Sequence, residues 1–173
     1  MQPCLVIVMG VSGSGKSLVG NYLAEHFNLD FVDGDDLHPA ENVELMRRGV
    51  QMDDQTRKPW LKSICKCAQT YFSKNKSVVI ACSALKKKYR QQLRLASRPV
   101  LFVFLEGTQK VISERLNSRK GHYMPASLLD SQFVDLEDPT GEPDIVWINI
   151  NQTKEAVLAE AVEKVKASMI DSP

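Results

Sequence analysis

Four short stretches of the chain are apolar almost throughout, and they constrain the fold more than any other feature of the sequence. They are residues 4–9, 77–82, 100–105 and 145–150, and a fifth, less apolar stretch follows the first at residues 31–33. Continuously apolar strands are typical of a parallel sheet that is covered on both faces, whereas strands with one wet face alternate. The sequence therefore predicts a five-stranded parallel sheet.

The stretches between these strands have the spacing of amphipathic helices. They are residues 16–27, 39–48, 56–73, 85–95, 109–119 and 126–136, and Thr153 is placed to cap a last helix. Strands that alternate with helices predict an α/β three-layer sandwich. We expect one domain over residues 1–173, with a short mobile lid at about 119–136, because Gly121 and Pro125 bracket a helix interruption.

Composition excludes several classes of protein. The chain has 22 Lys and Arg against 21 Asp and Glu, and a net charge of +1 gives no reason to expect a nucleic-acid or membrane partner. Its apolar runs fall far short of the roughly 20 residues that a membrane helix needs. The four cysteines form no CxxC pair and no zinc spacing, and no basic segment precedes the first apolar run. We expect a cytoplasmic protein with reduced thiols.

The loop after the first strand satisfies the phosphate-binding pattern G-x-x-x-x-G-K-[ST]. Its residues are Gly10, Val11, Ser12, Gly13, Ser14, Gly15, Lys16 and Ser17. Glycines let successive backbone N–H groups point at phosphate oxygens, and the helix that follows adds its N-terminal dipole. We expect this loop to bind ATP, with Lys16 at the β- and γ-phosphates and the Ser17 hydroxyl on Mg²⁺.

Three classes of nucleotide-binding protein remain: a switch GTPase, a motor or binding module, and a small-molecule kinase. The only Asn-Lys pair, at residues 75–76, lacks the acid that reads guanine, and no Asp ends the third strand. Acids instead follow the second strand, at Asp33, Asp35 and Asp36. Two carboxylates two residues apart, Asp33 and Asp35, suit a kinase, with Asp33 in the magnesium shell and Asp35 as the base. A solvated loop that caps the next helix would have the same composition.

Taken together, these motifs resemble the gluconate kinase family, which is related to shikimate kinase among the NMP-kinase-like P-loop kinases. The resemblance covers almost the whole chain and rests on the strings GVSGSGKS (10–17), DGDDLHP (33–39), RKPWL (57–61) and CSALKKKYR (82–90). It implies ATP-dependent phosphorylation of D-gluconate at the 6-hydroxyl, which gives 6-phospho-D-gluconate. A related kinase for shikimate or another sugar acid, and a nucleotide-binding module without transfer activity, are the alternatives.

The resemblance and the chemistry of gluconate together assign roles to the polar residues. A guanidinium binds a carboxylate bidentately, so Arg57 is the expected carboxylate clamp, although an exposed surface arginine would look the same. The other substrate-binding candidates are Asp35, His38, Ser83, Lys86 and Arg90, the ATP-binding candidates outside the loop are Arg115 and Arg119, and the catalytic candidates are Lys16, Asp35 and Arg119. His38 would equally suit a helix entry, and Arg115 and Arg119 a helix C-terminus. The expected partners are the two small molecules, and the resemblance is compatible with a homodimer.

Overall fold

Five parallel strands form a single sheet in the order β2-β3-β1-β4-β5. The structure is a computed structural model that describes residues 2–96, 99–118 and 126–170. The strands are β1 (Leu5–Met9), β2 (Asp30–Asp33), β3 (Val78–Ala81), β4 (Val100–Glu106) and β5 (Ile145–Asn149). Strand β1 is central, the chain leaves it toward β2 on one side, and the connection from β3 crosses it to β4 on the other, so the loop after β1 lies where open α/β sheets bind ligands.

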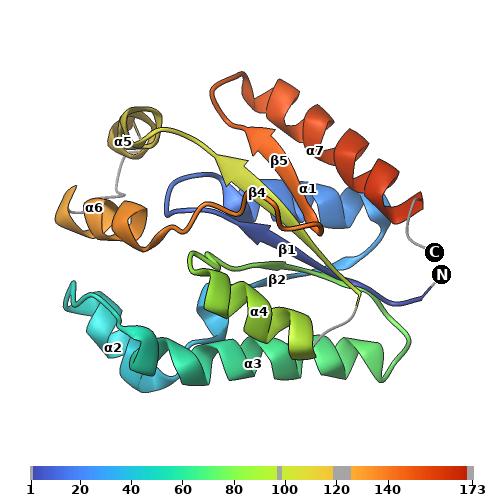
Figure 1. Ribbon diagram of the computed structural model, residues 1–173, viewed down its shortest axis with the longest axis horizontal. Coiled ribbons are helices and arrows are strands. Elements are labelled where there is room, and N and C mark those ends of the chain that lie inside the picture. The colour runs from blue at the N-terminus through green and yellow to red at the C-terminus, as the bar shows by residue number, and fades with distance from the viewer. Residues whose placement is uncertain (1, 97–98, 119–125, 171–173) are drawn as a thin grey trace.

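Helices cover both faces of the sheet. They are α1 (Lys16–Phe27), the 3₁₀ helix η1 (Gly34–Leu37), α2 (Ala40–Arg47), α3 (Asp54–Phe72), α4 (Lys87–Ala96), α5 (Gln109–Ser118), α6 (Ala126–Asp135) and α7 (Lys154–Ile170). In Figure 1, α1 and α7 lie on one face and α3 and α4 on the other, while α5 and α6 lie toward the carboxyl ends of the strands. The predicted three-layer α/β sandwich is confirmed.

The core explains why the strands are apolar on both faces. Val6 and Val8 of β1 belong to the core under α1 and α7, whereas Leu5, Ile7 and Met9 belong to the core under α3 and α4. All five side chains are at most 1% exposed. Successive residues of a strand point to opposite faces, so a sheet buried on both faces needs an apolar residue at every position.

Two local features differ from the sequence prediction. Asp33 accepts a hydrogen bond from the backbone N–H of Asp35 (3.0 Å) and caps the start of η1. The sequence does not predict this short helix, because its residues show no hydrophobic periodicity. Helix α4 begins at Lys87, because Ala84 has a left-handed backbone (φ 45°) that delays the helix. Of the expected lid, residues 119–125 lie outside the described residues, and most of the rest is α6.

Among the described residues, no helix is both long enough and apolar enough to cross a bilayer.

Candidate active site

The phosphate-binding loop joins the end of β1 to the start of α1. Gly13 and Gly15 have positive φ angles of 81° and 98°, and Gly15 is the residue that precedes the first turn of α1. A side chain at Gly13 would also meet Leu116, since a Cβ there would lie 2.7 Å from that side chain. The glycines are therefore required by backbone conformation and by close packing, and the loop leads into a helix start, whose N–H groups suit an anion.

Ser17 and Asp33, the two residues expected to hold magnesium, lie together. The Ser17 hydroxyl donates to Asp33 Oδ2 at 2.9 Å. Hydroxyl and carboxylate oxygens are the hard ligands that Mg²⁺ prefers, and phosphates and water usually complete its shell. The described residues hold no group of three or more His, Cys, Asp or Glu side chains arranged for a metal.

Lys16 and Asp35 line the same cavity and influence each other's charge. Burial lowers the pKa of Lys16, and Asp35 opposes that shift. Desolvation raises the pKa of Asp35, Lys16 opposes it, and Asp33 adds to it. Because 78% of the Asp35 side chain is exposed, water in the cavity offsets part of this rise. Asp35 is thus a carboxylate that can accept a proton beside the phosphate-binding loop.

His38 is buried and held in one neutral form. Its ring stacks on Trp60 with centroids 4.3 Å apart, and desolvation, aided by the charge of Arg57, lowers its pKa to about 4. Asn42 donates one amide N–H to Thr56 O (2.7 Å) and its other faces His38 Nδ1 (3.3 Å). With Nδ1 accepting, the proton sits on Nε2, which lies 3.9 Å from Asp35 Oδ1. His38 therefore presents an N–H donor toward Asp35.

Arg57, the expected carboxylate clamp, already has an acidic partner. Its Nη1 donates to Asp135 Oδ2 of α6 at 2.9 Å and to the Tyr89 hydroxyl at 3.2 Å. The same Asp135 carboxylate approaches Lys86 Nζ at 3.8 Å. Two cations expected to bind a substrate anion are thus bridged by a carboxylate of the protein.

Lys86, Lys88 and Tyr89 all contact Asp54, the first residue of α3. Lys86 donates to Asp54 Oδ1 at 3.0 Å, and Asp54 also accepts hydrogen bonds from Lys88 and from the Tyr89 hydroxyl. The hydrogen bonds from Lys88, Tyr89 and Lys86 hold the pKa of Asp54 well below its usual range. We call Arg57, Lys86, Tyr89, Asp54 and Asp135 the cleft cluster.

Arg90 lies elsewhere, contrary to the expectation that it would bind substrate. Its side chain is fully buried; Nη1 donates to Ala84 O and Leu85 O, both at 2.9 Å, and Nε and Nη2 donate to Glu142. Arg94 binds Glu142 and Asp144 beside it. Burial raises the pKa of Glu142, but the hydrogen bonds from Arg90 and Arg94 outweigh burial and lower it. We call these four charged residues the structural cluster, because Arg90 fixes the turn that carries Ser83 into the cavity.

Of the two arginines expected to bind ATP, the structure describes only Arg115. Arg115, near the end of α5, donates to the carbonyl oxygens of Ile150 and Gln152, in the loop between β5 and α7. Arg115 thus ties the end of α5 to the loop that follows β5. Arg119 lies outside the described residues.

One cavity of about 260 Å³ is lined by six of the expected site residues. Its expected members are Ser12, Lys16, Asp35, His38, Arg57 and Ser83, and its further lining residues include Met46, Trp60, Leu128, Ser131 and Gln132. Gln132 was not expected: its Oε1 accepts a hydrogen bond from the N–H of Ser12 at 2.6 Å. Since this contact spans 120 residues of sequence, no local pattern reveals it.

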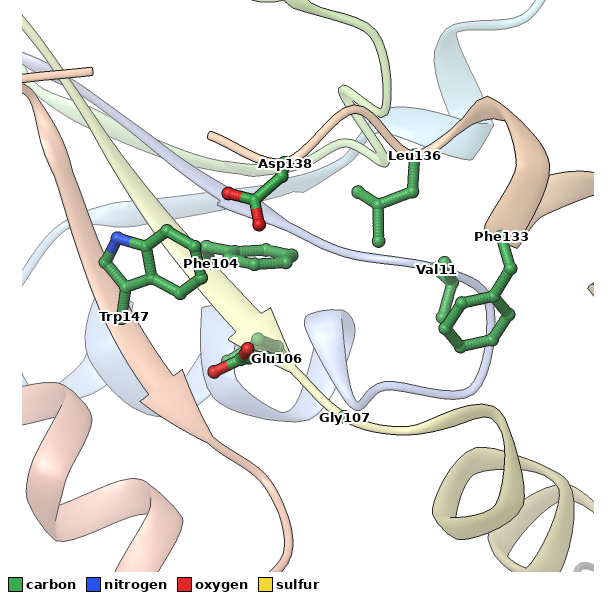
Figure 2. A pocket seen from close by; sticks show the side chains of 9 residues that line it. Val11, Phe104, Glu106, Gly107, Phe133, Leu136, Asp138 and Trp147 are labelled. Carbon is green, nitrogen blue, oxygen red and sulfur yellow. The ribbon is translucent and has the colours of Figure 1, made fainter. Parts of the chain in front are cut away.

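A second cavity, of about 250 Å³, lies beside the phosphate-binding loop and includes Val11 in its wall. Figure 2 shows Phe133 of α6 next to Val11 of the loop, with Phe104 and Trp147 of β4 and β5 at the other end of the cavity. Phe133 packs against the core cluster that contains Val11. Consecutive residues of α6, Gln132 and Phe133, therefore meet consecutive residues of the loop, Ser12 and Val11.

Comparison with known proteins gives one consistent result. The family model described as shikimate kinase matches residues 12–165. The chain is 45% identical to the thermosensitive gluconokinase of Escherichia coli K12 (88% of this chain, 87% of that protein) and 41% identical to the thermoresistant gluconokinase of the same organism (94% and 93%). A crystal structure of a gluconokinase from Sinorhizobium meliloti 1021 superposes with a TM-score of 0.87 at 40% identity, covering 97% of this chain and 96% of that one. Identity at this level over nearly the whole length shows that the chain belongs to the gluconokinase family.

Proposed function

We propose that this protein transfers the terminal phosphoryl group of ATP to the 6-hydroxyl of D-gluconate and releases ADP and 6-phospho-D-gluconate. The observation that carries the proposal is that one cavity places Lys16 of the phosphate-binding loop, the Asp35 carboxylate and the Arg57 guanidinium around the same space. A kinase for a sugar acid needs these three groups: a cradle for the donor phosphates, a base for the accepting hydroxyl, and a cation for the acceptor's carboxylate.

The nucleotide occupies the loop of residues 10–17 in this proposal. Backbone N–H groups of the loop and the Lys16 ammonium bind the β- and γ-phosphates, and Ser17 with Asp33 holds Mg²⁺. The metal, when bound, neutralises charge on the phosphates. Arg115, whose guanidinium contacts the loop that follows β5, is assigned to nucleotide binding in this proposal. The role of Arg119 in ATP binding and catalysis stays a prediction.

Gluconate occupies the rest of the cavity. Its carboxylate binds Arg57 with support from Lys86, and its 6-hydroxyl faces Asp35. Asp35 accepts the hydroxyl proton as the O6–P bond forms and the bond between the γ-phosphorus and its bridging oxygen breaks, so that ADP leaves with the electron pair. The neutral His38 donates from Nε2 to a substrate hydroxyl beside Asp35, and Ser83 adds a further polar group at the cavity wall.

A substrate panel tests the proposal. ATP-dependent ADP release is measured with gluconate, shikimate and other sugar acids, with Asp35→Asn as the variant that lacks the base. We expect gluconate to have the highest kcat/KM and Asp35→Asn to lose most of kcat. A clear preference for shikimate or another acid, or ATP binding without ADP release from any acid, would contradict the proposal. The homodimer stays a prediction, since the proposed site uses one chain.

Arg57→Met separates the role of the carboxylate from that of the hydroxyls. A charge-assisted hydrogen bond contributes about 1.5–3 kcal/mol, so we expect the KM for gluconate to rise about 10- to 100-fold while the KM for ATP stays nearly constant. Arg47→Met is the matched control, because Arg47 lies on the surface of α2 and pairs only with Glu44 among the described residues. A gluconate KM that Arg57→Met leaves unchanged would place the carboxylate elsewhere.

A further inference from the structure

Gln132 lies in the cavity in an orientation that the surrounding hydrogen bonds determine. The N–H of Ser12 is a donor, so the atom of Gln132 that meets it at 2.6 Å has to be the amide oxygen. The amide nitrogen is therefore not the atom that contacts the N–H of Ser12. The orientation of Gln132 thus follows from its partner, independently of how its two terminal atoms are assigned.

The amide nitrogen of Gln132 retains two donors for a ligand. Among the described residues, Nε2 has no hydrogen-bond partner. Gln132 lines the cavity together with Lys16 of the phosphate-binding loop and with Asp35. A pair of donors held in this way, next to the loop and in the cavity of the expected base, is suited to bind an anion that passes between them.

Helix α6 is fixed to the loop on both sides of Gln132. Phe133 lies beside Val11 (Figure 2), and Leu129, one turn earlier, is only 3% exposed in the core. Beyond the helix, the N–H of Glu137 donates to Leu85 O at 2.9 Å. A donor needs little reorganisation during a reaction when its backbone is held at several points, and that is the condition under which a hydrogen bond lowers a barrier most.

We propose that Gln132 is a catalytic residue: Oε1 stays on the N–H of Ser12, and Nε2 donates to an oxygen of the phosphoryl group during its transfer. The inference rests on the proposed function, because it needs a phosphoryl group that moves from the loop toward Asp35. In phosphoryl transfer the negative charge spreads over the three equatorial oxygens of the transferred group. A neutral amide stabilises that charge without competing with substrate carboxylates for Lys16 or Arg57.

Gln132→Met tests this role, since methionine keeps the length of the side chain and loses both kinds of hydrogen bond. Removing one preorganised donor lowers kcat by about 10²- to 10³-fold in comparable sites, and we expect a fall of about 10²-fold with the KM values for ATP and gluconate changed less than about threefold. Gln109→Met is the matched control. Gln109, the first residue of α5, contacts Asp130 of α6 and does not line the cavity. A kcat within threefold of the parent protein, or a loss that appears only in KM, would overturn the proposal.

Gln132→Glu distinguishes catalysis from mere anchoring of α6. Glutamate keeps an acceptor for Ser12 and loses the donors, but it regains one donor when it is protonated. We expect the ratio of its kcat to that of the parent protein to rise as the pH falls toward the pKa of a carboxyl group. A ratio near one at every pH would mean that Gln132 only anchors the helix. The parent protein, assayed with the same acids, reports separately whether gluconate is the substrate, and any acid that it phosphorylates serves for the Gln132 variants.

Discussion

The cleft cluster and the structural cluster have the same chemistry and different uses. Each joins two basic side chains to two carboxylates, and each involves residues of the segment between β3 and the end of α4. Arg90 is fully buried and all three of its nitrogens bind protein oxygens. Within the described residues, Arg57 donates hydrogen bonds only from Nη1, and its side chain lines the cavity.

The difference shows how a binding arginine is told from a structural one. A guanidinium whose donors all have protein acceptors cannot recognise a ligand without breaking the fold, whereas one with donors at a cavity wall can. Charge and sequence position do not separate the two, because both arginines belong to motifs of the same family. Variants that remove each charge in turn sharpen the contrast.

The largest effect is expected at Arg90. Arg90→Met leaves Glu142 buried with one basic partner fewer, and removing one member of a buried ion pair costs about 3–5 kcal/mol of unfolding free energy. Denaturant unfolding measures the loss, and Arg57→Met, which removes only the two hydrogen bonds of Nη1, should lose much less. If Arg90→Met does not fold, Glu142→Gln provides the milder test. Equal losses at Arg57 and Arg90 would contradict the distinction.

A smaller effect, dependent on pH, is expected at His38 beside the cleft cluster. Its pKa is about 4 in the folded protein and 6.5 for an ordinary histidine, so below pH 6.5 the unfolded chain binds a proton that the folded protein rejects. Stability is therefore full above pH 6.5 and declines as the pH falls toward 4, by about 3 kcal/mol at about 1.4 kcal/mol per pKa unit. Asp35 and Arg57 face this ring.

His38→Gln isolates that contribution, because other groups titrate in both proteins. We expect the unfolding free energy of the variant to fall less between pH 7 and pH 4 than that of the parent protein. Histidine NMR titration gives the second measurement, and an imidazole that protonates near pH 6.5 would contradict the account. In Arg57→Met the pKa of His38 should rise, since the charge of Arg57 contributes to its depression.

The sequence predicts the part of the molecule whose signals are local. The phosphate-binding residues Gly10 to Ser17 are contiguous in sequence, so their spacing alone predicts the conformation of the loop. Ser17 follows β1 and Asp33 ends β2, so the parallel sheet places both at its carboxyl edge, although β3 separates the two strands. Apolar strands likewise predict the sandwich. Each of these features depends on residues a few positions apart or on strand order alone.

Contacts between distant segments are where the prediction fails. The sequence places Lys86 and Arg90 in one predicted helix over residues 85–95 as substrate-binding candidates, but α4 begins only at Lys87, and Lys86 contacts Asp54 whereas Arg90 contacts Glu142. From α6, Gln132 contacts Ser12 across 120 residues of sequence and Asp135 contacts Arg57 across 78. Gln132 is one of several polar residues of α6, so nothing in the local sequence distinguishes it or identifies its partner.

The smallest and most specific effect is expected at Asp135. Its carboxylate occupies the Arg57 and Lys86 donors that gluconate needs in the proposed function, so the substrate competes with it. Asp135→Asn weakens this competitor by about 1 kcal/mol, the difference between a charged and a neutral acceptor, and the KM for gluconate should fall about fivefold with kcat nearly unchanged. Asp130→Asn is the matched control, because Asp130 lies on the same helix and contacts Gln109. A KM that rises instead would mean that Asp135 orients Arg57 for the substrate, and the two clusters would then both use their carboxylates to hold an arginine in place.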